Sequence, residues 1–246
     1  PFQFVKSIDN CMEPMLYGLC DDANIECYKV GNEQQEVLLV DNYLKGASAL
    51  KEYAVQQNGF ARADSFYPGL RMQVPQQYTI ALVKNLGFFM EQFFHLEVRT
   101  IKSAVTKFSI VTTRPNELDL LQRIPHFDSP SRKGLAVVHY LQSLPGMGTS
   151  LYRHKPTNFE YVDEQRYSGY MANVQERFPS ADTYPEGYIN GSTDQYEEIM
   201  SVDAVFNRLL MYSGTSLHSG KIGKDYNFDP SPATGRLTLT SFFEFR

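Results

Sequence analysis

From about residue 97 to its end, the chain reads as a succession of short β-strands, and this pattern constrains the fold more than any other feature. From Thr100 to Thr112, every second residue belongs to one set, and the residues between them are mostly smaller or polar. This two-residue period is typical of a strand. The set is Thr100, Lys102, Ala104, Thr106, Phe108, Ile110 and Thr112. Between Pro and Gly breaks, later runs predict strands over 135–141, 148–152, 207–212 and 236–245. A closed antiparallel β structure is the expected core.

The first 95 residues predict mostly helical structure. An apolar run at 37–40 indicates one buried strand within 36–43, and apolar residues at three- and four-residue spacing predict helices over 47–57 and 78–94. We expect these helices to pack on one sheet.

The whole of 1–246 is expected to form a single, mainly β domain with supporting helices. In this division 1–95 is a helical lead-in and 96–246 is the β core, with an insertion over 155–205. One further helix is predicted over 193–200, because Ser192 or Thr193 can act as its N-cap and acidic residues follow in the early turns.

Composition narrows the class of protein. Hydrophobic residues make up 42% of the chain and charged residues 21%, as in globular proteins that bury a core. The formal net charge of −5, with scattered basic residues, argues against a nucleic-acid partner. The chain has no apolar run of about 18 residues, and its first ten residues lack a secretion signal, so we expect no membrane partner and a cytoplasmic location.

The cysteines do not suggest a site. Cys11, Cys20 and Cys27 are odd in number and lack Cys-x-x-Cys spacing, which favours free thiols over a zinc or redox motif. Free thiols suit a reducing compartment.

His126-Phe127-Asp128 is the one place where an acid follows a histidine by two residues. On a strand, positions i and i+2 project to the same side, so His126 and Asp128 can meet one ion. His218, after the run at 207–212 and a turn, is the candidate for a second imidazole from a distant strand.

Two imidazoles and one carboxylate leave coordination positions open on Fe(II), whereas a structural zinc site has four protein ligands. Each residue also has a plainer interpretation: an ion pair on a surface strand for His126 and Asp128, and a hydrogen-bonded loop histidine for His218.

The order of these motifs resembles a known superfamily. His126-Phe127-Asp128, the run at 135–141 and the Gly-rich turn at 146–152 resemble the first half of a prolyl-hydroxylase-type 2-oxoglutarate/Fe(II)-dependent oxygenase. The runs at 207–212, 217–220 and 235–243 resemble the second half, and the likeness extends over about 36–246.

This resemblance implies a double-stranded β-helix, or jelly-roll, in which His126, Asp128 and His218 hold Fe(II). It implies 2-oxoglutarate and O₂ as cosubstrates, with Arg236 and Thr238 binding the far carboxylate of 2-oxoglutarate through charge-assisted and ordinary hydrogen bonds. Tyr140 is a further candidate for that carboxylate, or else a core tyrosine. The 17 residues between His218 and Arg236 exceed the usual family spacing and predict an enlarged loop.

The implied activity is that of a dioxygenase that hydroxylates or otherwise oxidises a C–H bond. The carboxylate of Asp128 favours this over halogenation, since halogenating relatives carry a small residue there. The substrate is expected to be polar: an amino acid, a peptide side chain or a small metabolite.

Substrate contacts are predicted less directly. Arg71 follows a turn at Tyr67-Pro68-Gly69 and either faces the active site or is only part of a structural turn. His154 lies either at the mouth of the barrel, where it could contact substrate, or in a solvated basic loop. The segment 159–188, rich in Tyr, Arg and Glu, is a candidate lid. His139, within an apolar run, is expected in the core.

Two other functions stay open at this point. A non-catalytic barrel that binds a metal or 2-oxo acid would act as a sensor or scaffold. A cupin-type metalloenzyme would need more histidine ligands and would not use Arg236. We expect a small-molecule or peptide partner and allow for a homodimer.

Overall fold

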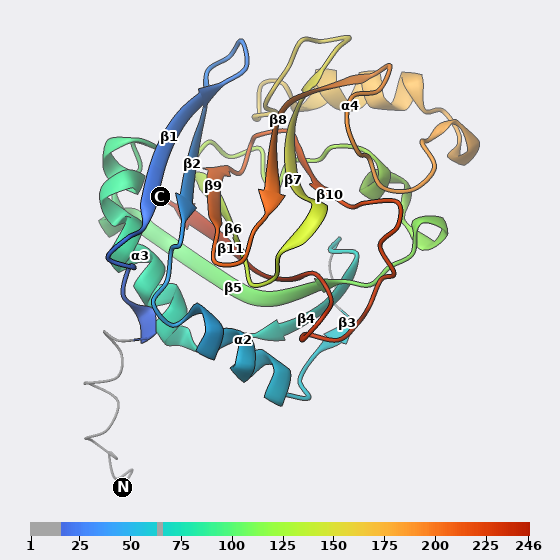
Figure 1. Cartoon of the computed structure of the whole chain (residues 1–246). Coiled ribbons are helices and arrows are strands. Elements are labelled where there is room, and N and C mark those ends of the chain that lie inside the picture. The colour runs from blue at the N-terminus through green and yellow to red at the C-terminus, as the bar shows by residue number, and fades with distance from the viewer. Residues whose placement is uncertain (1–15, 63–65) are drawn as a thin grey trace, which may run out of the picture.

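Two antiparallel β-sheets form the framework of the computed structural model, which describes residues 16–62 and 66–246 (Figure 1). In spatial order, the eight strands of the larger sheet are β1 (Asn24–Val30), β2 (Gln35–Asp41), β9 (Leu209–Ser213), β6 (Gly134–Tyr140), β11 (Leu237–Phe245), β5 (Ile101–Val111), β4 (Gly69–Gln73) and β3 (Ala61–Arg62). The smaller sheet contains β10 (His218–Lys221), β7 (Leu144–His154) and β8 (Tyr196–Ala204).

Helices lie outside the sheets or in the connections. The α-helices are α2 (Ala47–Gln56), α3 (Gln76–Gln92) and α4 (Tyr167–Arg177), and single 3₁₀ turns occur at Val98–Thr100, Pro115–Glu117, Leu120–Arg123 and Ala181–Thr183. In Figure 1, α2 and α3 lie on the side of β5 that faces away from β7, β8 and β10. The larger sheet is therefore the middle layer, with helices on one face and the smaller sheet on the other.

From β5 onward the chain crosses repeatedly between the two sheets. After β5, the segment at His126 forms an antiparallel bridge with His218 and so extends the smaller sheet beside β10. The chain then returns to the larger sheet at β6, forms β7 and β8 in the smaller sheet, and alternates again through β9, β10 and β11. This winding brings residue 126 next to residue 218.

Side chains of β6 show how the middle layer separates two cores. Leu135 and Val137 point to the helical side and pack with α2 and α3 residues such as Leu50 and Leu82. Ala136, Val138 and Tyr140, which alternate with them along β6, point into the space between the sheets. A strand that buries both faces reads as a continuous apolar run, which is why the sequence indicated it without alternation.

Most predicted elements are confirmed. The strand at 37–40 lies in β2, the helices at 47–57 and 78–94 correspond to α2 and α3, and the strands at 135–141, 148–152, 207–212 and 236–245 correspond to β6, β7, β9 and β11. The chain is mainly β, with large antiparallel sheets and few helices. The lead-in 1–95 nevertheless also supplies β1, β2, β3 and β4 of the larger sheet, and the insertion 155–205 supplies β8.

The prediction of a helix over 193–200 is wrong, because this segment forms a turn followed by β8. The Thr193 hydroxyl does accept a hydrogen bond from the backbone N–H of Tyr196, at 3.0 Å, as an N-cap residue would. The same short-range contact also stabilises turns, so it does not distinguish the two outcomes. The segment becomes a strand because β8 forms antiparallel hydrogen bonds with β7.

A helix occurs instead within the predicted lid, as α4. Asp163 stabilises the turn that leads into α4, since its carboxylate accepts a hydrogen bond from the Arg166 backbone N–H at 3.1 Å. Arg166 is the N-cap residue, and its side chain makes no cap hydrogen bond. Tyr170 and Val174 of α4 pack on Tyr152 and Tyr196 of the smaller sheet. The helix therefore covers the outer side of that sheet.

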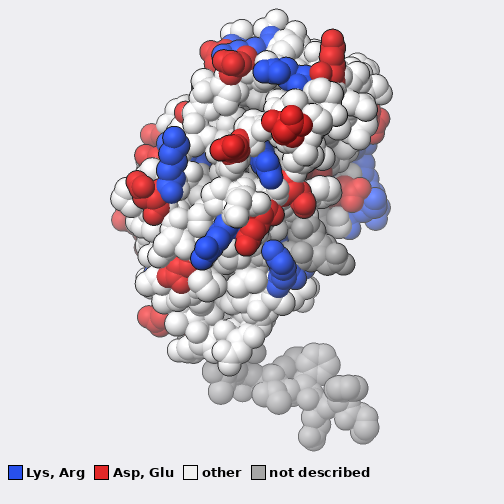
Figure 2. Space-filling model, turned by 90° about the vertical axis from the view of Figure 1, so that its right-hand side faces the viewer, with Lys and Arg blue, Asp and Glu red and all other residues white. Residues whose placement is uncertain are grey.

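The outer surface and the thiols add little to function. Cys20 is half-buried and Cys27 is exposed, both as free thiols, and Cys11 lies outside the described residues. Within the described chain, none of the helices has the length and apolar character needed to cross a membrane. On the face in Figure 2, acidic and basic side chains are interspersed and form no continuous patch of one sign.

A buried polar cluster ties α3, β6 and the start of β9 together. His139 is fully buried, as expected of a core histidine, with Nδ1 3.0 Å from the Tyr78 hydroxyl and Nε2 3.0 Å from Asn207 Oδ1. Asn207 Oδ1 also accepts a hydrogen bond from the Leu44 backbone N–H at 2.9 Å. Burial lowers the pKa of His139 to about 4, so the ring is neutral and bridges the two partners as donor and acceptor.

We expect Asn207→Ala to lower the free energy of unfolding by about 2–4 kcal/mol. The substitution leaves the Leu44 N–H and the His139 ring buried without this acceptor, and each unsatisfied group costs roughly 1–3 kcal/mol. Urea denaturation followed by circular dichroism measures the change. Asn116→Ala, at an exposed position, is the control and should stay within about 0.5 kcal/mol of the parent. A loss below about 1 kcal/mol for Asn207→Ala would contradict this account of the cluster.

Candidate metal centre

Reciprocal backbone hydrogen bonds bring three polar side chains to one point. The His126 N–H donates to the His218 carbonyl at 2.9 Å, and the His218 N–H donates back to the His126 carbonyl at 2.8 Å. The Asp128 N–H donates to the Gly214 carbonyl at 2.8 Å. The short extended segment 126–128 is thereby fixed along the connection between β9 and β10.

The three side chains form a compact group. The ligand atoms of His126, Asp128 and His218 all lie within 4.8 Å of one another. His126 Nε2 lies 4.0 Å from Asp128 Oδ1, and His218 Nε2 lies 3.7 Å from Asp128 Oδ2. The two imidazole centroids are 4.3 Å apart. Within residues 16–62 and 66–246, this is the one cluster of His, Cys, Asp or Glu close enough to hold a metal ion.

Protonation states suit a cation at this point. Burial lowers the pKa of His126 and of His218 to about 4, so both rings are neutral near pH 7. Burial raises the pKa of Asp128 to about 6, against the opposing effect of His126 and Arg71. Removal from bulk water disfavours an isolated carboxylate, and a bound cation would restore its charged form.

The tautomer of His218 leaves its distal nitrogen available. Its Nδ1 lies 2.9 Å from the Ser216 carbonyl oxygen, which can only accept a hydrogen bond. Nδ1 therefore carries the proton, and the lone pair of Nε2 points toward Asp128. The Tyr212 ring, 4.7 Å from the His218 ring, packs beside it and restricts its rotation.

A cavity of about 940 Å³ opens at this group and is lined by all three residues. The His126 side chain is 50% exposed toward it, whereas the His218 side chain is 7% exposed. Three protein ligands beside open space fit a metal that keeps free positions for ligands, unlike a closed structural site.

Arg236 lines the same cavity from the start of β11. Its backbone N–H donates to the Tyr226 hydroxyl at 2.9 Å, and Nη2 donates to the Gly148 carbonyl at 2.6 Å. Its Nε is buried and has no hydrogen-bond partner among the described residues. The enlarged loop after β10 supplies Tyr226 and so positions the arginine despite the unusual spacing.

Thr238 and Tyr140 lie behind Arg236 rather than in the cavity wall. They are cross-strand partners on β11 and β6, and both are buried. The Thr238 hydroxyl donates to the Ser109 carbonyl at 3.3 Å, and the Tyr140 hydroxyl donates to the Thr149 hydroxyl at 2.7 Å. The Arg236 Cζ lies 5.7 Å from the Tyr140 ring centroid. The structure thus places the Tyr140 ring beside the guanidinium.

The two predicted substrate residues are placed differently. Arg71 lines the cavity, with its Cζ 4.5 Å from the Tyr67 ring centroid. His154 is not among the described residues that line the cavity. It is buried against Tyr170 and Tyr196, and its Nδ1 lies 2.8 Å from the Thr157 hydroxyl. Its basic neighbours in the sequence suggested a mouth position, but the alternation of β7 turns its side chain into the core under α4.

Several cavity residues were not identified from the sequence as part of a site. Tyr212 is one, although it ends a predicted strand and precedes the turn that leads to His218. Tyr67 is another, recognised only as part of a corner. The candidate lid contributes its α4 face, through Tyr167, Tyr170, Met171 and Val174, and the turn at Leu120–Arg123 contributes Leu121 and Gln122.

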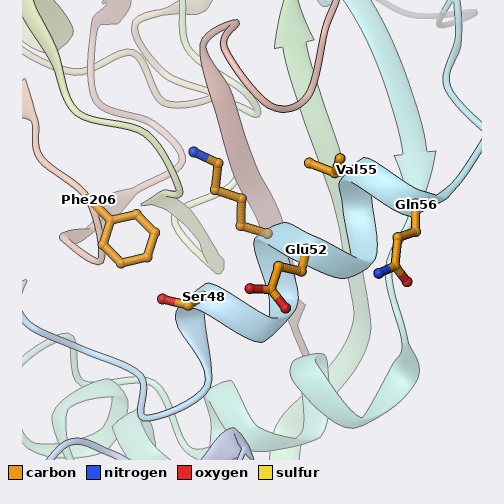
Figure 3. Close-up of a pocket in the computed structure, with 6 residues that line it drawn as sticks. Ser48, Glu52, Val55, Gln56 and Phe206 are labelled. Carbon is orange, nitrogen blue, oxygen red and sulfur yellow. The ribbon is translucent and has the colours of Figure 1, made fainter.

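A second cavity, of about 420 Å³, lies on the surface beside α2 (Figure 3). Ser48, Lys51, Glu52, Val55, Gln56 and Phe206 line it. Lys51 is hydrogen-bonded to Gln142, and this hollow lacks a convergent set of ligands. The hollow is therefore not a candidate metal centre.

Comparisons with solved structures give remote likenesses. The non-heme α-ketoglutarate dependent carbocyclase SnoK from nogalamycin biosynthesis is 10% identical, with a TM-score of 0.47 over 86% of this chain and 80% of that one. HygX from Streptomyces hygroscopicus, solved with nickel and 2-oxoglutarate, is 10% identical, with a TM-score of 0.39 over 85% and 83%. An N-substituted L-amino acid dioxygenase from Burkholderia ambifaria AMMD is 10% identical, with a TM-score of 0.37 over 86% and 82%.

Comparison at the level of sequence gives a family without an assigned function. No curated protein matches the chain. The model of the family of unknown function DUF6445 matches residues 21–243, which include all three candidate ligands and both sheets except the last two residues of β11. The chain therefore belongs to the DUF6445 family.

Proposed function

We propose that this protein is a non-haem Fe(II), 2-oxoglutarate-dependent dioxygenase that oxidises a C–H bond of a small molecule or peptide side chain. The single observation that carries the proposal is the convergence of His126, Asp128 and His218 on a cavity that also contains the buried Arg236. A 2-His-1-carboxylate set with open positions is the ligand arrangement of non-haem Fe(II) oxygenases.

We also propose that the two sheets form a double-stranded β-helix. Four strands of the larger sheet, in the order β5-β11-β6-β9, face the segment 126–128, β10, β7 and β8 of the smaller one. The chain alternates between these two sets, and this supports a double-stranded β-helix of the jelly-roll kind. The prolyl-hydroxylase-like branch is proposed from the motif order alone.

Bound Fe(II) would supply the redox chemistry by which O₂ decarboxylates the 2-oxo acid and oxidises the substrate. His126, Asp128 and His218 would hold it, and Asp128 would lose its raised pKa beside the cation. Arg236 would pair with the far carboxylate of 2-oxoglutarate, because its Nε is a buried donor without a partner among the described residues. Tyr140, whose ring centroid lies 5.7 Å from the Arg236 Cζ, would restrict the guanidinium to this orientation. Thr238, two residues further along the chain, would contribute its hydroxyl next to this group. The aromatic wall of α4 would exclude water from the reacting atoms.

We expect His218→Ala and Asp128→Ala to weaken binding of Ni(II) or Co(II) at least about 100-fold, since even the loss of a supporting residue around a metal costs 10–100-fold. Anaerobic isothermal titration calorimetry measures this. His95→Ala is the control, because His95 is exposed and lies outside the cavity. Equal affinities in all four proteins would rule out this ion site.

Metal affinity should also depend on pH in a defined window. Protons compete with metal for Asp128, whose pKa is about 6 without a cation, while both imidazoles stay neutral down to about pH 4. Affinity for Ni(II) should therefore change little between pH 7.5 and 6.5 and then fall by about tenfold per unit below pH 6. Titrations at half-unit steps test this. A decline that begins near pH 7 would indicate imidazoles with ordinary pKa values instead.

Catalysis is tested by succinate formation. With Fe(II), ascorbate and O₂, the wild type should convert 2-oxoglutarate to succinate, and His126→Ala should abolish the conversion. Arg236→Gln should raise the KM for 2-oxoglutarate about 10–100-fold, because one charge-assisted pair contributes about 1.5–3 kcal/mol. Arg99→Gln, an exposed arginine outside the cavity, should leave KM unchanged. Metal-loaded wild type that forms no succinate, with any substrate offered, would favour a non-catalytic binding protein.

A further inference from the structure

A second guanidinium, that of Arg71, faces the same cavity. On the larger sheet, Arg71 of β4 pairs with Ser109 of β5, and Ser109 pairs with Thr238 of β11. Directly paired residues in antiparallel strands project to the same side, so Arg71 lies on the inner face together with Thr238. The side chain also belongs to the cavity lining.

Arg71 is enclosed by aromatic rings rather than by acids. Its Cζ lies 4.5 Å from the Tyr67 ring centroid and 5.9 Å from that of Phe242. Its Nε is buried without a hydrogen-bond partner among the described residues. Burial lowers the pKa of Arg71, although an arginine stays charged at neutral pH. A buried charge of this kind is costly unless a counter-charge binds it.

Asp128 does not fill that role. It is close enough to Arg71 for each charge to influence the other's pKa. The two side chains nevertheless form no ion pair in the described structure, where the Asp128 oxygens are nearest to the two imidazoles. The proposed metal would also use this carboxylate. Arg71 thus lines the cavity with its Nε left without an acceptor among the described residues.

The balance of charge in the loaded cavity indicates what would pair with Arg71. A divalent metal and the two arginines bring four positive charges, and Asp128 and the two carboxylates of 2-oxoglutarate bring three negative ones. The opposite charges of Lys133 and Glu244, which also line the cavity, cancel each other. One positive charge remains. A singly charged anion would neutralise it, whereas a phosphate monoester, with nearly two charges, would leave an excess.

One part of the outer wall is apolar, whereas another part carries Lys133 and Glu244, which are both exposed. Phe66, Leu121 and Tyr167 line the cavity and are 73%, 40% and 45% exposed, respectively. Ile124 and Phe127 also line the cavity, and Phe127 packs on Tyr167 with 6.0 Å between the ring centroids. Exposed aromatic and aliphatic side chains around a cavity favour a ligand with an apolar body.

We propose that Arg71 binds the carboxylate of the substrate to be oxidised, and that the substrate class is monocarboxylic acids with an apolar or aromatic body. This inference rests on the proposed function. Arg71 forms the planar pair with the carboxylate, and the body of the substrate lies against the apolar wall. Arg236 serves the cosubstrate, so the two arginines divide the two anions between them.

The test uses full-length protein with Ni(II) and 2-oxoglutarate under nitrogen. Matched probes are 3-phenylpropionate, indole-3-propionate and octanoate, each compared with its primary amide, and phenethyl phosphate. Saturation-transfer NMR and calorimetry give the dissociation constants. At least one acid should bind ten or more times more tightly than its amide and than the phosphate. Arg71→Gln should reduce that preference below about twofold, Arg71→Lys should keep part of it, and Arg99→Gln should keep all of it.

Failures of the two proposals give different results. If the wild type with Ni(II) does not bind 2-oxoglutarate, the proposed function fails. If it does bind, but no acid is preferred over its amide, or the phosphate binds best, the assignment of Arg71 to a monocarboxylate is overturned. The assignment is also overturned if Arg71→Gln, rather than Arg236→Gln, abolishes 2-oxoglutarate binding while the protein retains its melting temperature. Preserved 2-oxoglutarate affinity with a lost acid preference supports it.

Discussion

The antiparallel bridge between His126 and His218 is the contact on which the site depends. Its two backbone hydrogen bonds join segments that are distant in the chain, and they place the imidazoles side by side at 4.3 Å. Side-chain contacts alone would not fix these rings, because His126 is half exposed to the cavity. The position of the third candidate ligand follows from the same pairing, since Asp128 is two residues further along the bonded segment.

The bridge in turn needs the two layers around it. The larger sheet buries both faces, one against α2 and α3 and the other against the smaller sheet, so its strands have little freedom to shift. Asn207 and His139 fasten the start of β9 to the helical layer. Outside the smaller sheet, α4 covers the ligand-bearing edge and also forms part of the cavity wall. Rigidity of the frame and shape of the cavity thus come from the same packing.

The cavity contains more positive than negative charge among its buried groups, and the fold keeps these groups together. Two arginines and a carboxylate are desolvated together, and aromatic rings rather than acids surround the arginines. In low dielectric, such groups interact strongly with any ion that enters and are costly while alone. The face in Figure 2 carries mixed charges.

Local patterns in the sequence were sufficient for much of this protein. Apolar periodicity predicted α2, α3, β2, β6 and β9, and the two-residue spacing of His126 and Asp128 put both on one side of an extended segment. These features depend on neighbours a few residues away, which is what a sequence shows directly. The N-cap signature at Thr193 marks the limit, because its hydroxyl stabilises a turn or a helix equally well, and only pairing with β7 made the segment a strand. Tertiary structure alone brought His218 to His126 and Asp128, turned Arg71 into the cavity and placed His154 in the core. Each of these outcomes depends on cross-strand register, and register is set by contacts between residues that lie far apart in the chain.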